Sequence, residues 1–142
     1  MLYRAVRVVA RTVVGFYFRG LTVSGRNHVP SRGPALFLAN HPQSITDSLI
    51  LGLAAGRRVH YVAHSGLFRN PLKARLLRAA GAIPVHRPRE GAEAGARNVE
   101  TFRACRDVLE AGGAIGIFPE GTSRQESRVQ PFRTGTARIA LE

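Results

Sequence analysis

A histidine and an aspartate at the end of an apolar run are the residues of this chain best suited to proton transfer. In "LFLANHPQSITDSLI", His41 follows the apolar residues 35–39, and Asp47 lies six positions further on. A neutral imidazole can take a proton from an alcohol, and a carboxylate on its other nitrogen fixes the tautomer and stabilises the cation that forms. The pattern therefore predicts a general base with its orienting acid. Ser44 with Asp47 is equally a helix-start pattern, so a purely structural interpretation also stands.

Two further segments bring polar groups to the ends of apolar runs. In "AIGIFPEGTSR", Gly121 permits close backbone approach, Thr122 offers a hydroxyl and Arg124 a charge, and Glu120 is suited to bind hydroxyls or balance arginines. Arg87 ends "GAIPVHR" and has the planar donor fork that suits a phosphate. These segments predict an anion-binding loop. A capped turn and a solvated surface arginine are the structural alternatives.

Alternating strands and helices must position these residues. Periodicity and turn residues predict strands over residues 21–25, 35–39, 58–64, 82–87 and 114–118, and helices over 1–20, 48–55, 71–80, 98–110 and from 134 onward. Asn98 is expected to cap the helix that it begins. The fold class is α/β, with a mostly parallel or mixed sheet flanked by helices. Loops at the carboxyl ends of such strands gather the chemistry, so His41, Arg87 and Glu120 should converge.

The spacing of the proposed dyad sets a condition on its backbone. On a straight helix His41 and Asp47 would lie about 240° apart. We therefore expect His41 in a non-helical turn before Ser44, with Pro42 keeping it there.

The charge of the chain is strongly positive and unevenly placed. The 142 residues fit one domain and carry a formal charge of +12, with no acidic residue before Asp47. Such a surface attracts nucleic acid, anionic lipid headgroups or phosphorylated substrates. We do not expect nucleic acid as the partner, because no strand face interleaves aromatic residues with arginines.

Neither a disulfide nor a metal site is expected. Cys105 is the single cysteine, and its place in a helix-like stretch predicts plain packing. His60 and His64 have a helical spacing but fall on a predicted strand, which would separate them.

Residues 1–20 are predicted to form a basic amphipathic helix. Arg4, Arg7 and Arg11 share one stripe, and much of the remaining surface is apolar. No apolar run approaches the roughly 20 residues that span a bilayer. The pattern is typical of an anchor on a membrane surface, which would make the protein membrane-associated at the cytoplasmic face. A helix docked on its own domain is the alternative.

Four blocks in this order resemble the glycerolipid and lysophospholipid acyltransferase superfamily: "GPALFLANHPQSITD", "GAIPVHR", "FPEGTSR" and "PFRTGTARIALE". The resemblance implies an acyltransferase domain over residues 21–142 that moves a fatty acyl group from acyl-CoA or acyl-carrier protein to a glycerol-phosphate or lysophospholipid. His41 would be the base and Asp47 its orienter. Arg87, Glu120, Gly121, Thr122 and Arg124 would hold the acceptor. No metal or cofactor is implied, and the alcohol would attack the thioester directly.

The chain departs from the usual family pattern in two ways. Five residues separate His41 from Asp47 where four are commoner, although one branch shares this gap, and Gln43 replaces the asparagine usual in that branch. Family members also continue past the equivalent of Glu142 into a further strand block, so a C-terminally truncated domain is expected. A non-catalytic module that binds anionic lipid or nucleic acid is the alternative function, and a thioesterase is a third.

Overall fold

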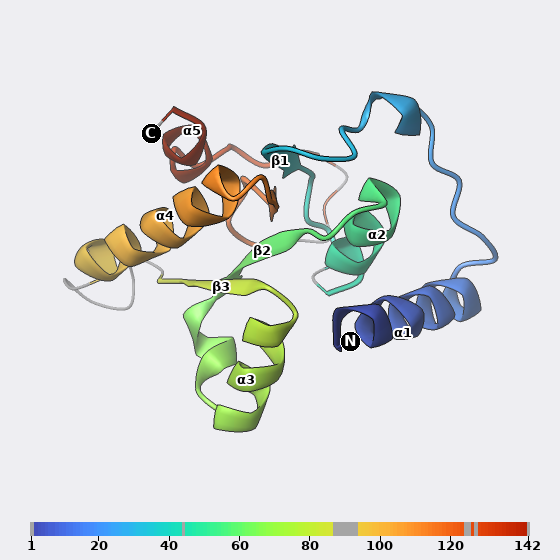
Figure 1. Ribbon diagram of the computed structural model, residues 1–142, viewed down its shortest axis with the longest axis horizontal. Coiled ribbons are helices and arrows are strands. Elements are labelled where there is room, and N and C mark those ends of the chain that lie inside the picture. The colour runs from blue at the N-terminus through green and yellow to red at the C-terminus, as the bar shows by residue number, and fades with distance from the viewer. Residues whose placement is uncertain (1, 44, 87–93, 124–125, 127, 142) are drawn as a thin grey trace.

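Strands and helices alternate along the chain, as predicted for an α/β fold. The computed structural model describes residues 2–43, 45–86, 94–123, 126 and 128–141 (Figure 1). The helices are α1 (Leu2–Tyr17), α2 (Ile45–Ala55), α3 (Pro71–Ala79), α4 (Ala94–Glu110) and α5 (Gly135–Leu141). The strands are β1 (Ala35–Leu38), β2 (His60–His64), β3 (Ala82–Val85) and β4 (Ala114–Ile117), with short 3-10 turns η1 (Arg26–His28) and η2 (Ser65–Phe68).

The four strands form one sheet in the order β1-β4-β2-β3. All of their pairings are parallel, which confirms the predicted fold class. Each strand is joined to the next by a helix, as parallel connections require. The last strand in the sequence, β4, enters between β1 and β2, so β1 and β4 become neighbours although about eighty residues separate them.

One face of the sheet carries the main apolar core. Ile83 of β3 and Ile115 and Ile117 of β4 pack with Cys105 of α4, and Ile139 of α5 lies against this cluster. The Cys105 side chain is 0% exposed, as the packing prediction requires, and its burial raises the pKa of the thiol to about 11. The helices α4 and α5 therefore cover this face (Figure 1).

The opposite face is covered by α2, and α1 packs on α2. The Tyr61 hydroxyl of β2 donates to the backbone oxygen of Ser48 in α2 at 2.7 Å. In the part of α1 whose burial is described, Ala10 and Val14, one helical turn apart, are the buried residues. The Tyr3 hydroxyl adds a hydrogen bond to the backbone oxygen of Arg57 just after α2. The predicted N-terminal helix is thus present and is docked on its own domain by one face.

Arg57 ties the loop before β1 to the end of α2. Its Nη1 donates to the backbone oxygen of Pro30 at 3.0 Å, and its Nη2 donates to the backbone oxygens of Gly33 at 2.7 Å and Gly112 at 2.9 Å. Gly33 leads into β1 and Gly112 into β4, so one guanidinium holds the starts of the two neighbouring strands that carry the site.

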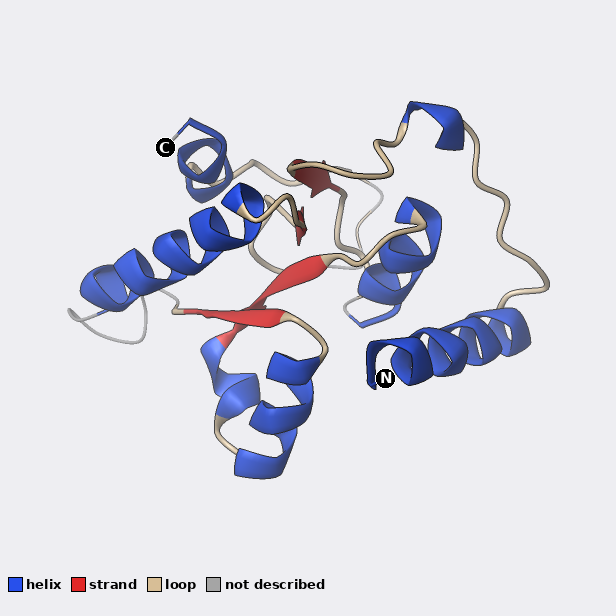
Figure 2. Ribbon diagram, in the orientation of Figure 1, coloured by secondary structure: helices blue, strands red, loops and turns tan. Residues whose placement is uncertain are grey.

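The strand predicted over residues 21–25 is wrong. This segment is a loop that runs along the periphery of the molecule from α1 to η1 (Figure 2). A strand exists through hydrogen bonds to a neighbouring strand, and the sheet places none beside this segment. Gly25, with φ of 70°, turns the chain into η1 instead.

Two helix starts also differ from the prediction. The helix α2 begins at Ile45, three residues earlier than expected, which places Asp47 in its first turn. The helix α4 begins at Ala94, so Asn98 is inside it and does not cap it. The Asn98 side chain instead exchanges two hydrogen bonds of 2.9 Å with the backbone of His86 after β3, because those main-chain groups lie within its reach.

Candidate active site

The neighbouring strands β1 and β4 deliver the two central loops of the candidate site. Leu38 pairs with Ile117 in the register, and the Ala39 N–H continues the pairing to the Ile117 oxygen at 3.3 Å. Both strands are parallel, so the loop bearing His41 and the loop that starts at Phe118 leave the same edge of the sheet. This is the convergence that the strand-end argument predicted for His41 and Glu120. Arg87 and Arg124 lie outside the described residues.

His41 and Asp47 meet in a direct hydrogen bond. His41 Nδ1 lies 3.0 Å from Asp47 Oδ2, and the two side chains are only 17% and 13% exposed. His41 stands in a non-helical turn and α2 starts at Ile45, so the predicted backbone condition is confirmed. A carboxylate only accepts, hence Nδ1 carries the proton and Nε2 is the nitrogen that can take one from a substrate.

The Asp47 carboxylate also serves the start of α2. The Gln43 backbone N–H donates to the same Oδ2 atom at 2.7 Å. An acid in the first turn thus satisfies one main-chain donor beside the helix, as the helix-start interpretation foresaw. The contact to His41 and the contact at the helix start are compatible, because a single oxygen receives both donors.

An aromatic ring covers the face of the imidazole. The Phe118 ring stacks on the His41 ring with centroids 3.9 Å apart and planes inclined by 15°. Sequence reasoning missed this residue. Its signal was its place as the last residue of the predicted buried strand over 114–118, directly ahead of the polar Pro-Glu-Gly segment.

The polar segment after β4 opens with a tight turn. The Gly121 N–H donates to the Phe118 oxygen at 3.0 Å, and Gly121 has φ of 66°, a left-handed value that favours glycine. Arg133 crosses this turn. Its backbone N–H donates to the backbone oxygen of Pro119 at 2.8 Å, and its side-chain Nε donates to the backbone oxygen of Glu120 at 3.3 Å. A Cβ at position 121 would lie 2.6 Å from Arg133 Cδ and Nε, so glycine is also needed for space. Arg133 is a second residue that sequence reasoning missed.

The remaining predicted binding residues lie close along the same loop. Glu120 is buried at 5% exposure and Thr122 is half-buried. Within the described part of the chain, no hydrogen bond joins Glu120 or Thr122 to His41 or Asp47. The structure thus brings this loop to the same sheet edge as the dyad, with the dyad and the loop linked through the Phe118 ring.

The other titratable groups that the structure describes are not grouped as metal ligands. The described residues contain no group of three or more His, Cys, Asp or Glu side chains arranged to hold an ion. His60 and His64 stand at opposite ends of β2, as the strand prediction required. Burial, with a contribution from the nearby Arg58 charge, lowers the pKa of His60 below its ordinary value.

The loop that carries the dyad adjoins α1. A small cleft of about 110 Å³ is lined from both sides, by Val13, Val14, Tyr17 and Phe18 of the α1 region and by Gln43, Thr46 and Leu49. Among the described helices, none combines the length and the apolar character needed to cross a bilayer. The N-terminal helix therefore lies beside the candidate site as a docked, partly exposed element.

The strand ends of this parallel sheet carry a His–Asp pair and a Pro-Glu-Gly turn. The chain belongs to the Acyltransferase family, whose model matches residues 20–142. Among curated relatives, the chloroplastic 1-acyl-sn-glycerol-3-phosphate acyltransferase of Arabidopsis thaliana is 28% identical over 128 residues, covering 88% of this chain and 33% of that protein. The 1-acyl-sn-glycerol-3-phosphate acyltransferase of Borreliella burgdorferi is 29% identical over 122 residues, covering 86% of this chain and 46% of that protein.

A solved structure shares the fold. The 1-acyl-sn-glycerophosphate acyltransferase PlsC of Thermotoga maritima superposes with a TM-score of 0.74 at 22% identity, over 97% of this chain and 52% of that one. The likeness confirms the α/β arrangement together with its N-terminal helix. This chain spans between a third and about half of the length of these proteins.

Proposed function

We propose that the protein transfers an acyl group from a thioester to the hydroxyl of a glycerol-phosphate or lysophospholipid. The observation that carries the proposal is the 3.0 Å contact between His41 Nδ1 and Asp47 Oδ2. In the proposed reaction Nε2 of His41 takes the proton of the acceptor hydroxyl as its oxygen attacks the thioester carbonyl. The thiolate leaves as the carbonyl re-forms. The departing thiolate then takes the proton from the His41 imidazolium. Asp47 holds the tautomer and stabilises the transient cation.

The acceptor is proposed to be 1-acyl-sn-glycerol-3-phosphate. Both curated relatives described above carry this substrate in their names. We assign the phosphate and glycerol oxygens to Arg87, Glu120, Gly121, Thr122 and Arg124. The turn at Gly121 and the net charge of +12 support this assignment, because exposed backbone and cationic side chains attract a phosphate. The acyl donor is a thioester of CoA or of acyl-carrier protein.

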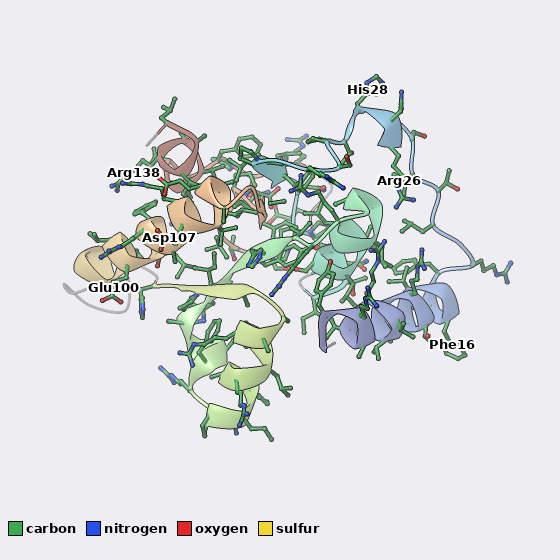
Figure 3. All side chains as sticks on the ribbon, viewed as in Figure 1. Phe16, Arg26, His28, Glu100, Asp107 and Arg138 are labelled. Carbon is green, nitrogen blue, oxygen red and sulfur yellow. The ribbon has the colours of Figure 1, made fainter. Side chains whose placement is uncertain are left out.

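We further propose that α1 lies on a membrane surface, at the cytoplasmic face. Its outward surface exposes Val8, Val9 and Phe16, and Phe16 is 94% exposed near the C-terminal end of the helix (Figure 3). A lipid acceptor must reach His41 from a membrane, and α1 adjoins the loop that carries the dyad. Apolar side chains in the headgroup region would hold the site near its substrate.

The three arginines of α1 point in two directions, one toward the domain and two toward the proposed membrane surface. Arg7 turns toward the domain, where Nη1 approaches the Gly56 oxygen at 3.5 Å. Arg4 and Arg11 are exposed and are the residues proposed to meet lipid phosphates. The two interpretations of this helix are therefore compatible, since one face packs on α2 and the other is open.

The activity is tested with four substrate pairs. Acyl-CoA or acyl-carrier protein is combined with 1-acyl-sn-glycerol-3-phosphate or glycerol-3-phosphate, in vesicles that contain anionic lipid, and release of free thiol is followed. We expect thiol release that depends on 1-acyl-sn-glycerol-3-phosphate. The assay is run on this chain and on any longer product of the same gene.

The same assay separates the alternatives. Thiol release without an acceptor would indicate a thioesterase. Salt-sensitive vesicle binding without turnover in either protein would indicate an anion-binding module, which the charge of +12 also favours.

A further inference from the structure

The stack between His41 and Phe118 acts on a different motion of the imidazole from the hydrogen bond to Asp47. A hydrogen bond at Nδ1 fixes the direction of that nitrogen in the ring plane. It leaves the ring able to tilt about the line that joins Nδ1 to the carboxylate, because terminal torsions of this kind are broad. A ring lying parallel at 3.9 Å blocks that tilt by contact. The two contacts together define where Nε2 points.

The stack is built into the fold through the β1–β4 register. Phe118 follows β4 directly, and the main-chain pairing of the two strands extends to Ala39, two residues before His41. The Phe118 backbone is fixed in turn by the hydrogen bond from Gly121. The aromatic ring therefore stands on a rigid strand end, whereas His41 stands on an irregular loop that gains most from an external support.

The same ring suits the charge that appears on His41 during proton transfer. The face of an aromatic ring is electron-rich and attracts a cation placed over it. An imidazolium formed against Phe118 would be stabilised more than a neutral imidazole, so the contact strengthens as the proton moves. A leucine in the same place would fill part of the volume but would give neither the flat contact nor the quadrupole.

We propose that Phe118 is a positioning residue that holds the His41 imidazole in the plane required for proton transfer and supports its cationic form. The inference rests on the proposed role of His41 as the general base. It assigns to Phe118 a function in turnover, beyond the packing of a strand end.

The test compares Phe118→Leu with Phe118→Tyr, and uses Phe102→Leu as the matched control. The Phe102 ring lies on α4 against the Arg138 guanidinium, 4.3 Å from ring centroid to Cζ, away from the dyad. We expect Phe118→Leu to lower kcat on the order of tenfold, which corresponds to about 1.4 kcal/mol. The KM for the acceptor should be unchanged. Phe118→Tyr, which keeps the ring, should restore most of kcat, and Phe102→Leu should leave it intact.

A second readout is independent of catalysis. In a sample with isotope-labelled histidine, the His41 ring protons should be shifted upfield by the Phe118 ring, and they are assigned by their loss in His41→Gln. Phe118→Leu should move these signals downfield, while the His60 signals and the urea midpoint stay within the range of the Phe102→Leu control. If the wild-type protein transfers no acyl group, the proposed function fails, and these signals still decide whether Phe118 holds the ring.

Two results would overturn the inference. One is an unchanged His41 spectrum in Phe118→Leu, which would show that the rings do not stack in solution. The other is wild-type kcat in a Phe118→Leu protein that has lost the upfield shift, which would show that the stack has no part in turnover.

Discussion

Replacing Asp47 with asparagine separates the charge of this side chain from its shape. The Asp47 Oδ2 atom receives His41 Nδ1 at 3.0 Å and the Gln43 N–H at 2.7 Å. An asparagine offers one acceptor oxygen and one NH₂ group. Because one Asp47 oxygen receives both donors, an asparagine oxygen in its place can still accept from the Gln43 N–H and from His41 Nδ1. What the substitution removes is the negative charge that stabilises the imidazolium formed during proton transfer.

The size of the effect follows from the burial of the pair. Both side chains are less than a fifth exposed, so water screens their interaction weakly. A hydrogen bond to a charged group in such a setting contributes about 1.5–3 kcal/mol. Each 1.36 kcal/mol corresponds to about a tenfold change in rate. We therefore expect Asp47→Asn to lower kcat by about 10- to 150-fold, while stability changes by less than about 1 kcal/mol because asparagine also suits a helix start.

The assay is thiol release with saturating 1-acyl-sn-glycerol-3-phosphate, alongside urea unfolding of each variant. The matched control is Asp107→Asn, which changes the only other aspartate of the chain. Asp107 is exposed on α4, and Figure 3 shows it on the side of the molecule that α4 covers. Wild-type kcat in Asp47→Asn, in a protein for which His41→Ala abolishes transfer, would refute the argument that the charge of this carboxylate supports proton transfer by His41.

Three further predictions concern stability. Burial lowers the His60 pKa below its ordinary value of 6.5, so as the pH falls the unfolded chain binds this proton more readily than the folded chain and stability is lost. His60→Gln should therefore reduce the loss of stability between about pH 7 and 5, measured by urea unfolding; an identical pH slope would contradict this. Gly121→Ala should destabilise the fold by about 1–3 kcal/mol through backbone strain and contact with its neighbour, whereas Gly135→Ala, with open space around it, should shift the thermal midpoint little. Arg57→Ala should lower the free energy of unfolding by about 2 kcal/mol, because three contacts to backbone carbonyls are lost. Arg58→Ala, whose wild-type side chain makes one backbone contact at 3.5 Å, should lower it by about 0.5 kcal/mol. Equal losses would argue against a stabilising role of the Arg57 contacts.

The sequence predicted those features of the fold and the site that depend on residues close together in the chain. The alternation of apolar runs with periodic segments predicted the α/β class and the four strands of the sheet. The pairing of His41 with Asp47 was predictable because both lie on one short segment, where Pro42 disfavours helix at His41. Cys105 was predictable as a core residue for a similar reason, since it lies on the apolar stripe of its helix.

The errors arose where a distant segment decides the outcome. Residues 21–25 have strand-like composition, yet no neighbouring strand is there to pair with them. The Asn98 side chain hydrogen-bonds the backbone of His86, a residue after β3, and does not cap its own helix. Phe118 was missed because its contact with His41 depends on β1 and β4 being neighbours, and strand order is not written in the order of the chain.

The central claim is that His41 takes the proton from the acceptor hydroxyl. Its most direct test is a single-turnover measurement of thioester consumption by wild type and by His41→Gln, with excess protein and 1-acyl-sn-glycerol-3-phosphate present. We expect the rate of the chemical step to fall by about 10²- to 10⁴-fold, with vesicle binding and the urea midpoint unchanged. A His41→Gln protein that consumes the thioester at the wild-type rate would contradict it.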